Sequence, residues 1–331
     1  MSAPSQPSIV DILSDAYARL NRNLWIVLIP LAINAALWFG PAVSFAQIFT
    51  DAAVLLREAQ PDDAPTTTPE MLQIRDQTIA VLDELGADDM RPWLAWLNVV
   101  PYAIYGFRAG GASGEGLGLP FVTAQPAKID PETAIFVDGF GGLVTVFALV
   151  NLIGLLASTL YLVLVARSWR RDGAIGELLM AIPKTLARLL LYPLAVVVVG
   201  LLVLIPVSIF GVLLMTLNPA FGAFLFFIGS AFWLWATIYI GFTRECMVLH
   251  DVGPFQAIKA SIALVRGAFW RVLGFLGLMM VVAAGSGIIF AGLVDSTAGR
   301  VGVVLASAYL FSGLSLARMR FVQLHTFVQG A

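Results

Sequence analysis

Residues 189–217 read LLLYPLAVVVVGLLVLIPVSIFGVLLMTL, without one charged side chain. A helix of that length rises about 43 Å at 1.5 Å per residue, whereas the hydrocarbon core of a bilayer is about 30 Å thick and is crossed by ~20 apolar residues. The stretch therefore predicts a membrane-spanning helix that tilts, kinks or projects into water at its ends. Asn218-Pro219 follows directly and predicts a tight turn into the next apolar stretch.

The composition of the whole chain agrees with a membrane protein. Of the 331 residues, 59% are hydrophobic and 12% are charged, against about 25% charged in soluble globular chains. So much apolar surface cannot be hidden in one water-soluble core, which excludes an ordinary soluble enzyme. The net charge of −2 supplies no basic field for nucleic acid. One cysteine and two histidines give no basis for a disulfide framework, a metal site or a cofactor site, so none is expected.

Six segments are predicted to cross the membrane, so the expected fold is an all-α polytopic membrane bundle. They cover residues 24–49, 140–166, 189–217, 221–249, 269–294 and 301–316, the last continuing to about 321. The chain then divides into a tail with an interfacial helix (1–23), the first span (24–49), an insertion (50–139), a five-helix region (140–322) and a second tail (323–331). The first apolar run lacks the short core and cleavage site of a signal peptide, and we expect it to stay as a signal anchor.

Basic residues set the predicted orientation. With both termini in the cytoplasm, 13 of the 19 basic residues and 6 of the 21 acidic residues face inward, a net inner charge of +7 against −9 outside. Cytoplasmic loops of membrane proteins are enriched in Lys and Arg. We therefore predict a multi-pass protein of the cell membrane with cytoplasmic termini and with residues 50–139 on the extracytoplasmic side.

The sequence contains a candidate internal repeat. Residues 16–28, AYARLNRNLWIVL, align without gaps with residues 261–273, SIALVRGAFWRVL, and share Ala18/Ala263, Trp25/Trp270, Val27/Val272 and Leu28/Leu273. A weaker copy covers 178–192. Each copy has an amphipathic stretch, near 9–20, 175–187 and 254–265, followed by apolar spans, which predicts three parallel helix-hairpin repeats. The alternative explanation is convergent composition, because cytoplasmic helix starts favour Arg and Trp.

The amphipathic stretches predict helices that lie at the inner membrane interface. Their apolar side, with Phe255, Ile258, Ile262 and Val265 in the last copy, is expected in the acyl boundary, and their Lys and Arg near anionic head groups. Interfacial aromatic residues are expected at the same level. The candidate lipid head-group or interfacial contacts are Arg22, Trp25, Arg188, Arg244, Lys259, Arg266, Trp270 and Arg271.

The layout, and above all the segment AIKASIALVRGAFWRVL at 257–273, resembles a broad group of six-span bacterial and archaeal membrane proteins. The group includes the membrane domain found fused to glycerophosphodiester phosphodiesterases. The resemblance implies a six-span bundle with interfacial helices. The fused catalytic barrel, with its acidic and histidine ligands, has no counterpart in this sequence, so no catalytic residue is carried over. The long insertion also departs from the compact pattern of the group.

The insertion at 50–139 holds 14 acidic and 5 basic residues. Thr68-Pro69-Glu70 predicts the start of a helix, and Gly86 predicts its end. A second helix is expected at 92–107 on the outer interface, with a re-entrant segment as the alternative, followed by a flexible glycine-rich loop at 106–118. The apolar side chains of the two helices form the candidate partner surface: Met71, Ile74, Val81, Leu85, Trp93 and Trp96.

Ionisable residues are missing from the middle of the predicted spans, although membrane enzymes and proton-coupled pumps need such groups at depth. The deepest charges are Arg244 and Glu245, which are expected to pair with interfacial charges. His250-Asp251 invites a catalytic interpretation, but no serine or cysteine nucleophile with a recognisable motif is near. Small residues at four-residue spacing in the last two spans predict close packing, within the bundle or to another chain: Ala283, Gly287, Ala291, Gly302, Ala306, Gly313 and Ala317.

These features favour a non-catalytic membrane component, namely a scaffold, a lipid-binding protein or an accessory subunit. Its expected partners are membrane lipids and other membrane proteins, not nucleic acid. A transporter or permease for a neutral or lipidic substrate is the first alternative, because parallel repeats and polar Asn34 and Asn151 fit it. A lipid-modifying enzyme built on Arg244, His250 and Asp251 is the second, although no catalytic motif is present.

Overall fold

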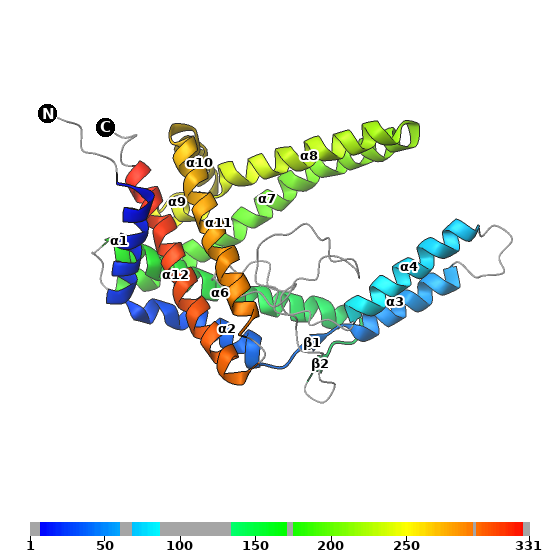
Figure 1. The fold of residues 1–331 in the computed structure, drawn as a ribbon, viewed down its shortest axis with the longest axis horizontal. Helices are drawn as coiled ribbons and strands as arrows, with labels where there is room; N and C mark the ends of the chain where they lie inside the picture. Colours follow the sequence, from blue (N-terminus) through cyan, green and yellow to red (C-terminus); the bar gives the residue numbers. More distant parts are fainter. Residues whose placement is uncertain (1–6, 60–67, 87–133, 171–174, 294–295, 327–331) are drawn as a thin grey trace. The chain divides into compact units, whose positions relative to one another are not determined.

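The computed structural model describes residues 7–59, 68–86, 134–170, 175–293 and 296–326. Helices carry almost all of this part of the chain, and its strands form a single two-residue pair (Figure 1). The first half contains α1 (Ile9–Arg22), η1 (Leu24–Val27), α2 (Leu28–Phe39), β1 (Val43–Ser44), α3 (Ala46–Ala59), α4 (Pro69–Gly86), β2 (Ile135–Phe136) and α6 (Gly139–Arg170). The second half contains α7 (Ile175–Leu217), α8 (Pro219–Ile240), α9 (Thr243–His250), α10 (Pro254–Gly267), α11 (Phe269–Ala291) and α12 (Thr297–Thr326).

The expected all-helical class is confirmed, and the chain contains helices suited to crossing a membrane. Five described helices are long and apolar enough to cross a membrane, or up to six if α1 and the following Leu24–Phe39 segment, bent by 93°, form one span. The packing contacts divide the chain into two compact units. Unit 1 comprises Met1–Ile26, Leu155–Met279 and Ser312–Ala331, and unit 2 comprises Val27–Gly154 and Met280–Phe311, so α6, α11 and α12 each contribute one part to each unit.

The first predicted span, 24–49, is not one helix. Helix α2 ends at Phe39, and Gly40 is extended with φ −77° and ψ 166°. Pro41 explains this break, because a proline disfavours helical geometry in the residue before it. The α-helical part is only 12 residues long, preceded by a four-residue 3-10 turn, which is shorter than the ~20 residues of an ordinary span.

Two further boundaries differ from the sequence-based expectation. The predicted interfacial helix at 175–187 is not separate, because α7 runs unbroken for 43 residues with Pro183, Pro193 and Pro206 inside it. The predicted boundary between 187 and 189 contains only Arg188, and neither a glycine nor a proline is present there to end a helix. The predicted span at 221–249 coincides with a candidate span at Ala220–His250, but a short turn divides it, since α8 ends at Ile240 and α9 starts at Thr243.

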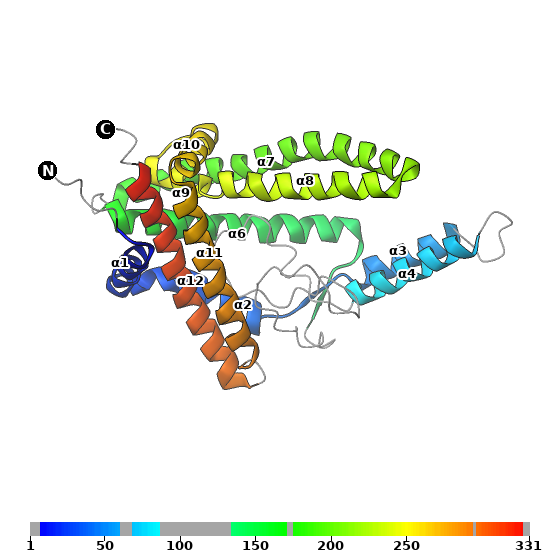
Figure 2. The same ribbon diagram turned by 45° about the horizontal axis from the view of Figure 1, so that its top comes forward.

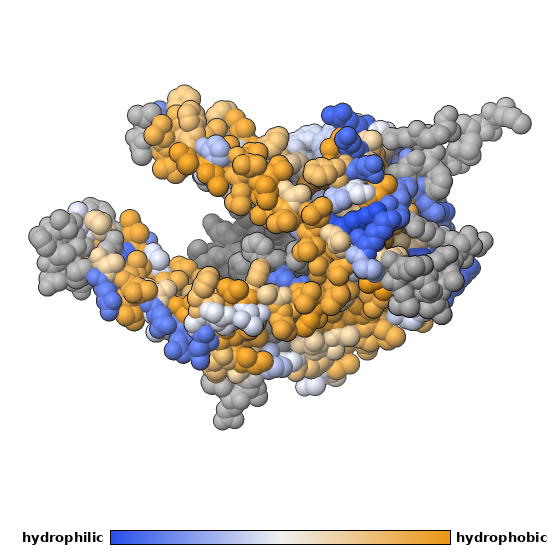
Figure 3. Space-filling model, turned by 180° about the vertical axis from the view of Figure 1, so that it is seen from behind, coloured by the Kyte–Doolittle hydropathy of each residue, from blue (hydrophilic) through white to orange (hydrophobic). Residues whose placement is uncertain are grey.

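The α7–α8 hairpin in unit 1 is as predicted, and Figures 1 and 2 show the two helices side by side. Asn218 caps α8, its side-chain oxygen accepting from the Ala220 N–H at 3.0 Å. Exposed apolar residues such as Leu202, Ile209 and Phe227 cover the hairpin, which is orange in Figure 3. A helix that is apolar on all sides is typical of a membrane span.

Helices α1 and α10 both pack into unit 1. The apolar side of α1 is buried there, which corrects the expectation that it lies in lipid, whereas of the four apolar residues predicted to face lipid on α10 only Val265 is buried. Helix α1 buries Ile12, Ala16 and Leu20 at four-residue spacing. Helix α10 matches its predicted bounds closely, but it buries Pro254, Ala257, Ser261, Leu264 and Val265 and leaves Phe255 69% exposed. The small side chains allow α10 to approach α8 and α9 closely, whereas the larger Phe255 faces outward.

The ends of α1 and α10 share an unusual backbone geometry. Asn23 closes α1 with φ −137° and ψ 48°, and Ala268 closes α10 with φ −139° and ψ 36°. These two positions correspond in the aligned repeat, as do the exposed Trp25 and Trp270 that follow them. The buried positions 12, 16 and 20 of α1 correspond to the buried positions 257, 261 and 265 of α10. The two breaks are therefore built alike.

Unit 2 contains the described part of the insertion. Helix α4 begins at Pro69 and ends at Gly86 as predicted, and the Thr68 hydroxyl accepts from the Met71 N–H at 3.3 Å. It packs against α3 as an antiparallel hairpin (Figures 1 and 2). At its base β1 pairs in parallel with β2, and Val43, Phe45 and Val137 form a small core there. A second core joins Trp38, Phe290, Val303 and Val304.

Candidate functional site

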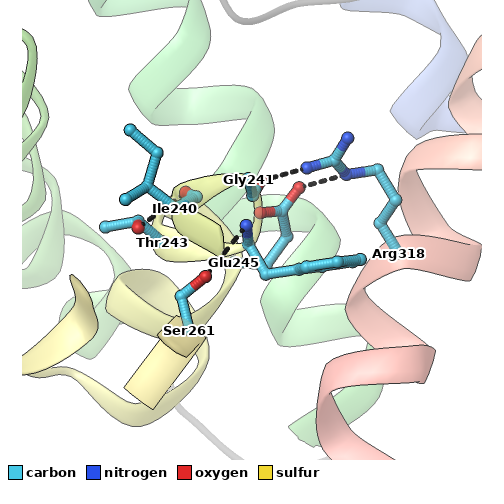
Figure 4. A network of polar contacts seen from close by, with 7 residues as sticks. Ile240, Gly241, Thr243, Glu245, Ser261 and Arg318 are labelled. Atoms are coloured by element: carbon cyan, nitrogen blue, oxygen red, sulfur yellow. Dashed lines mark hydrogen bonds and ion pairs between the residues drawn. The ribbon is translucent and has the colours of Figure 1, made fainter. Parts of the chain in front are cut away.

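A polar network in unit 1 surrounds the break between α8 and α9 (Figure 4). The last carbonyls of a helix lack partners within the helix and must find them elsewhere. Here the Ser261 hydroxyl of α10 donates to Tyr239 O at 2.7 Å, and the Thr243 hydroxyl donates to Ile240 O at 2.7 Å. Ser261 also accepts from the Phe242 N–H at 3.2 Å. Side chains from two helices therefore end α8.

An ion pair between Arg318 and Glu245 completes this network. Arg318 Nε lies 2.5 Å from Glu245 Oε1, and a second nitrogen of the guanidinium donates to Gly241 O. The side chain of Glu245 is 10% exposed and that of Arg318 is 28% exposed. The signs suit the helix dipoles, since the cation meets the carboxyl end of α8 and the anion lies in the first turn of α9. The pair thus joins α8, α9 and α12.

Aromatic rings close one side of the pair. The Arg318 guanidinium lies 5.2 Å from the centroid of the Phe242 ring, a cation–π contact. Phe242 stacks on Phe321 at 5.6 Å, and Phe321 stacks on Phe275 at 4.6 Å. All three rings are fully buried. The ion pair therefore lies next to a stack of buried aromatic rings. Removing one partner of the pair would leave the other charge without compensation there.

A second charge cluster joins α7 to the end of α9. Asp251 has a left-handed backbone with φ 53°, and its two carboxylate oxygens accept from Lys184 at 2.7 Å and Arg188 at 2.5 Å. The hydrogen bond from Lys184, and then the contact with Arg188, hold the pKa of Asp251 below its ordinary value. The carboxylate is thus engaged with α7, which weakens the catalytic interpretation of His250-Asp251. One turn further along α7, Tyr192 lies 5.8 Å from the Arg244 guanidinium.

Helix α1 is held by charged and aromatic contacts as well as by its apolar side. Asp15 pairs with Arg320 at 3.2 Å, and Arg19 Nε donates to Ser168 O at 2.6 Å. Both guanidinium groups lie about 5 Å from the ring of Trp169, at 5.0 Å for Arg19 and 5.1 Å for Arg320. These contacts tie α1 to α6 and α12, so α1 is a packed part of unit 1.

The predicted head-group contacts fall into two sets. Three of them make internal bonds: Arg188 binds Asp251, Arg244 stacks on Tyr192, and Arg271 donates to Pro7 O and contacts His325. The other five are exposed at the protein surface: Arg22, Trp25, Lys259, Arg266 and Trp270.

The predicted partner surface is described only in part. Met71, Ile74 and Val81 are 39%, 63% and 54% exposed on α4, whereas Leu85 is half-buried. Ile79, which the sequence did not single out, is buried on α4, the helix that packs against α3. Trp93, Trp96 and the rest of 87–133 lie outside the described residues.

Polar residues in the spans bond mainly to their own helices. Asn34 donates to Pro30 O at 2.9 Å and Asn151 donates to Phe147 O at 2.8 Å, each four residues back. Such local bonds to the carbonyl four residues back are a common way for a buried amide to satisfy one of its donors. Among the described residues, no group of three His, Cys, Asp or Glu side chains is placed to bind a metal ion.

The expected pairing of the deepest charges was right for Glu245, but its partner could not be read from the sequence. Arg318 is 73 residues away, and no spacing rule connects the two. A useful signal was that both lie near the ends of predicted spans that the charge pattern assigns to the cytoplasmic side. Comparison of the chain with protein-family models, with curated proteins and with solved structures finds no match. The resemblance to the six-span group therefore remains an expectation.

Proposed function

We propose that this protein is a non-catalytic integral membrane component, a scaffold, lipid-binding protein or accessory subunit. The observation that carries the proposal is the use of the carboxylates in unit 1. Each of the four described acidic side chains there makes a structural contact. Asp11 caps α1 through Ser8, and Asp15 binds Arg320. Glu245 binds Arg318, and Asp251 binds two cations of α7. General acid–base chemistry or a proton relay needs a carboxylate poised for proton transfer. A structural role accounts for all four.

The proposal includes six crossings of the cell membrane, cytoplasmic termini and an extracytoplasmic insertion. Its support is the distribution of charge between the two units. Unit 1 carries eleven of the fourteen described basic side chains but only four of the ten described acidic ones. A basic excess marks the cytoplasmic side of a membrane protein. Unit 2 carries the remaining six acids, most of them on α3 and α4.

We also propose that α1–α2 and α10–α11 are copies of one repeated unit. The support is the match in sequence, in buried positions and in the backbone geometry at Asn23 and Ala268. Convergent composition accounts for shared Arg and Trp, but it does not account for two breaks with nearly equal dihedral angles. An amphipathic helix followed by an apolar helix, repeated in the same direction relative to the membrane, is a parallel repeat. The third copy, at 178–192, has weaker support, because α7 continues through it without a break.

A transporter or permease for a neutral or lipidic substrate is the alternative function, and the break between α8 and α9 favours it. Discontinuous helices bind substrates in many transporters through their free carbonyls and N–H groups. At this break, however, Ser261, Thr243 and Arg318 already occupy the carbonyls of α8. The geometry therefore supports a structural joint better than a substrate site.

Purification in mild detergent, with identification of the proteins and lipids that remain bound, tests the proposal. A scaffold or accessory subunit should retain lipids or a membrane protein in fixed stoichiometry. Reconstitution into vesicles supplies the second measurement. Recovery of a bare chain, or time-dependent transport or turnover of a lipid by the reconstituted protein, would count against the non-catalytic role.

A further inference from the structure

One exposed face of α10 and the start of α11 combines two cations with two aromatic side chains. Phe255, Lys259 and Arg266 lie within about 40° of one another on a helix with 100° per residue. Trp270 follows just past the break at Ala268. Phe255 is 69% and Trp270 is 79% exposed, and both cations are exposed as well. These four residues are named the α10 stripe.

The direction of the stripe is fixed by the packing of α10. Its opposite side buries Ala257, Ser261 and Leu264, and Ser261 is bonded into the end of α8. Within the described part of the chain, Lys259 and Arg266 form no ion pair, and the four acidic side chains that the structure describes in unit 1 contact other groups. The stripe is therefore a rigid cationic surface, flanked by aromatic rings, whose charge the described protein does not neutralise.

We infer that the α10 stripe binds the head groups of anionic phospholipids. The inference rests on the proposed membrane function and names the lipid class. Lys and Arg near a membrane are attracted by anionic head groups, and Trp is enriched at the depth of the head groups. The long stems of Lys259 and Arg266 also suit an interface, because they lie along apolar surface while the charged ends reach phosphate. Charge complementarity thus favours lipid over a neutral surface.

The repeat supplies an internal comparison. The positions of α1 that align with the stripe are Val10, Ser14, Asn21 and Trp25, and all four are exposed. The aromatic anchor is kept at Trp25, but neither middle position is basic. Preference for anionic lipid should therefore belong to α10, and the α1 positions give a matched control on the same kind of helix.

The test measures lipid retention by the full chain. The protein is equilibrated with equal amounts of phosphatidylglycerol and phosphatidylcholine in mixed micelles, and bound lipids are counted by native mass spectrometry. Each cation near an anionic surface is worth about fivefold in binding, so K259Q/R266Q should lower the preference for phosphatidylglycerol about 30-fold. The control S14Q/N21Q should leave it unchanged. Both pairs alter exposed side chains, and equal melting temperatures confirm that the variants fold.

Two results would overturn the inference. One is an unchanged phosphatidylglycerol preference in K259Q/R266Q. The other is equal loss in K259Q/R266Q and S14Q/N21Q, which would assign retention to the helices in general. If the first result comes together with capture of an acidic protein by the wild type and not by K259Q/R266Q, the stripe binds a protein partner instead of lipid. Retention is measured without turnover, so discovery of transport or catalysis would refute the proposed function while leaving the lipid site intact.

Discussion

The ion pair between Glu245 and Arg318 should behave as one unit in unfolding. Glu245→Leu leaves the Arg318 guanidinium beside Phe242 without its counter-ion. Breaking a buried pair costs about 3–5 kcal/mol. Because Arg318 is 28% exposed and water reaches it, we expect E245L to lower the free energy of unfolding by about half of the smaller value, about 1.5 kcal/mol. Arg318→Met leaves a more deeply buried carboxylate and also frees Gly241 O. A lost hydrogen bond adds about 1 kcal/mol, which gives about 2.5 kcal/mol.

The double variant E245L/R318M should be more stable than either single variant. Replacing a whole buried pair by apolar side chains is often neutral, so only the loss at Gly241 O remains, about 1 kcal/mol. At about 2 °C per kcal/mol for a chain of this size, the melting temperature should fall by about 3 °C in E245L, 5 °C in R318M and 2 °C in the double variant.

Thermal unfolding in one detergent, followed by tryptophan fluorescence, measures these shifts. The exposed pair at Lys184 supplies a control, because that side chain is 54% exposed and K184Q should change stability by less than about 0.5 kcal/mol. The reasoning fails if the double variant melts about 8 °C below the wild type. The effects of E245L and R318M would then simply add, and the two side chains would not depend on each other.

Three further predictions concern packing, pH and topology. A Cβ at Gly313 would lie 2.2 Å from Tyr17 Cε1, whereas a Cβ at Gly302 meets nothing within 4 Å. G313A should therefore destabilise the protein by about 1–3 kcal/mol and make α1 more susceptible to proteolysis. G302A in the same helix should be neutral or slightly stabilising. The pKa of Asp251 is lowered in the folded protein by Lys184 and Arg188, so its contribution is present above the unfolded pKa of about 4 and is lost as pH falls through the folded value. The melting difference between wild type and D251N should accordingly be constant from neutral to mildly acidic pH and shrink below about pH 4; a difference that grows in acid would reverse the assigned sign. Cys246 is buried, so the native cysteine should not react with an impermeant maleimide. Added to intact cells, the maleimide should label D76C, whose native side chain is 65% exposed, and should label K259C only after permeabilisation. The opposite pattern would invert the topology.

Several boundaries were predictable because they depend on neighbouring residues alone. The start of α4 at Pro69 and its end at Gly86 follow from capping chemistry, and the turn at Asn218 follows from its side chain and the next proline. The break after Phe39 was equally local, and Gly40-Pro41 was its signal. The merging of 175–187 into α7 was not predictable in this way, because amphipathicity alone does not say where a helix stops.

The candidate site shows the same division. Five of the predicted lipid contacts are exposed, and composition near a span end had singled them out: Arg22, Trp25, Lys259, Arg266 and Trp270. Arg188 and Arg244 carry the same signal, yet they bind Asp251 and stack on Tyr192. The sequence cannot separate the two sets, since the difference lies in which side of a helix meets another helix.

Hydropathy along the chain was sufficient to predict helices suited to crossing a membrane, because the cost of apolar surface in water adds up residue by residue without regard to partners. Helix ends with a proline, glycine or capping amide were fixed in the same local manner. Which charges are joined was decided only when α12 brought Arg318 to Glu245 and α7 brought Lys184 to Asp251, across separations of 73 and 67 residues. Electrostatic energy depends on distance in space, and the chain must fold before those distances exist.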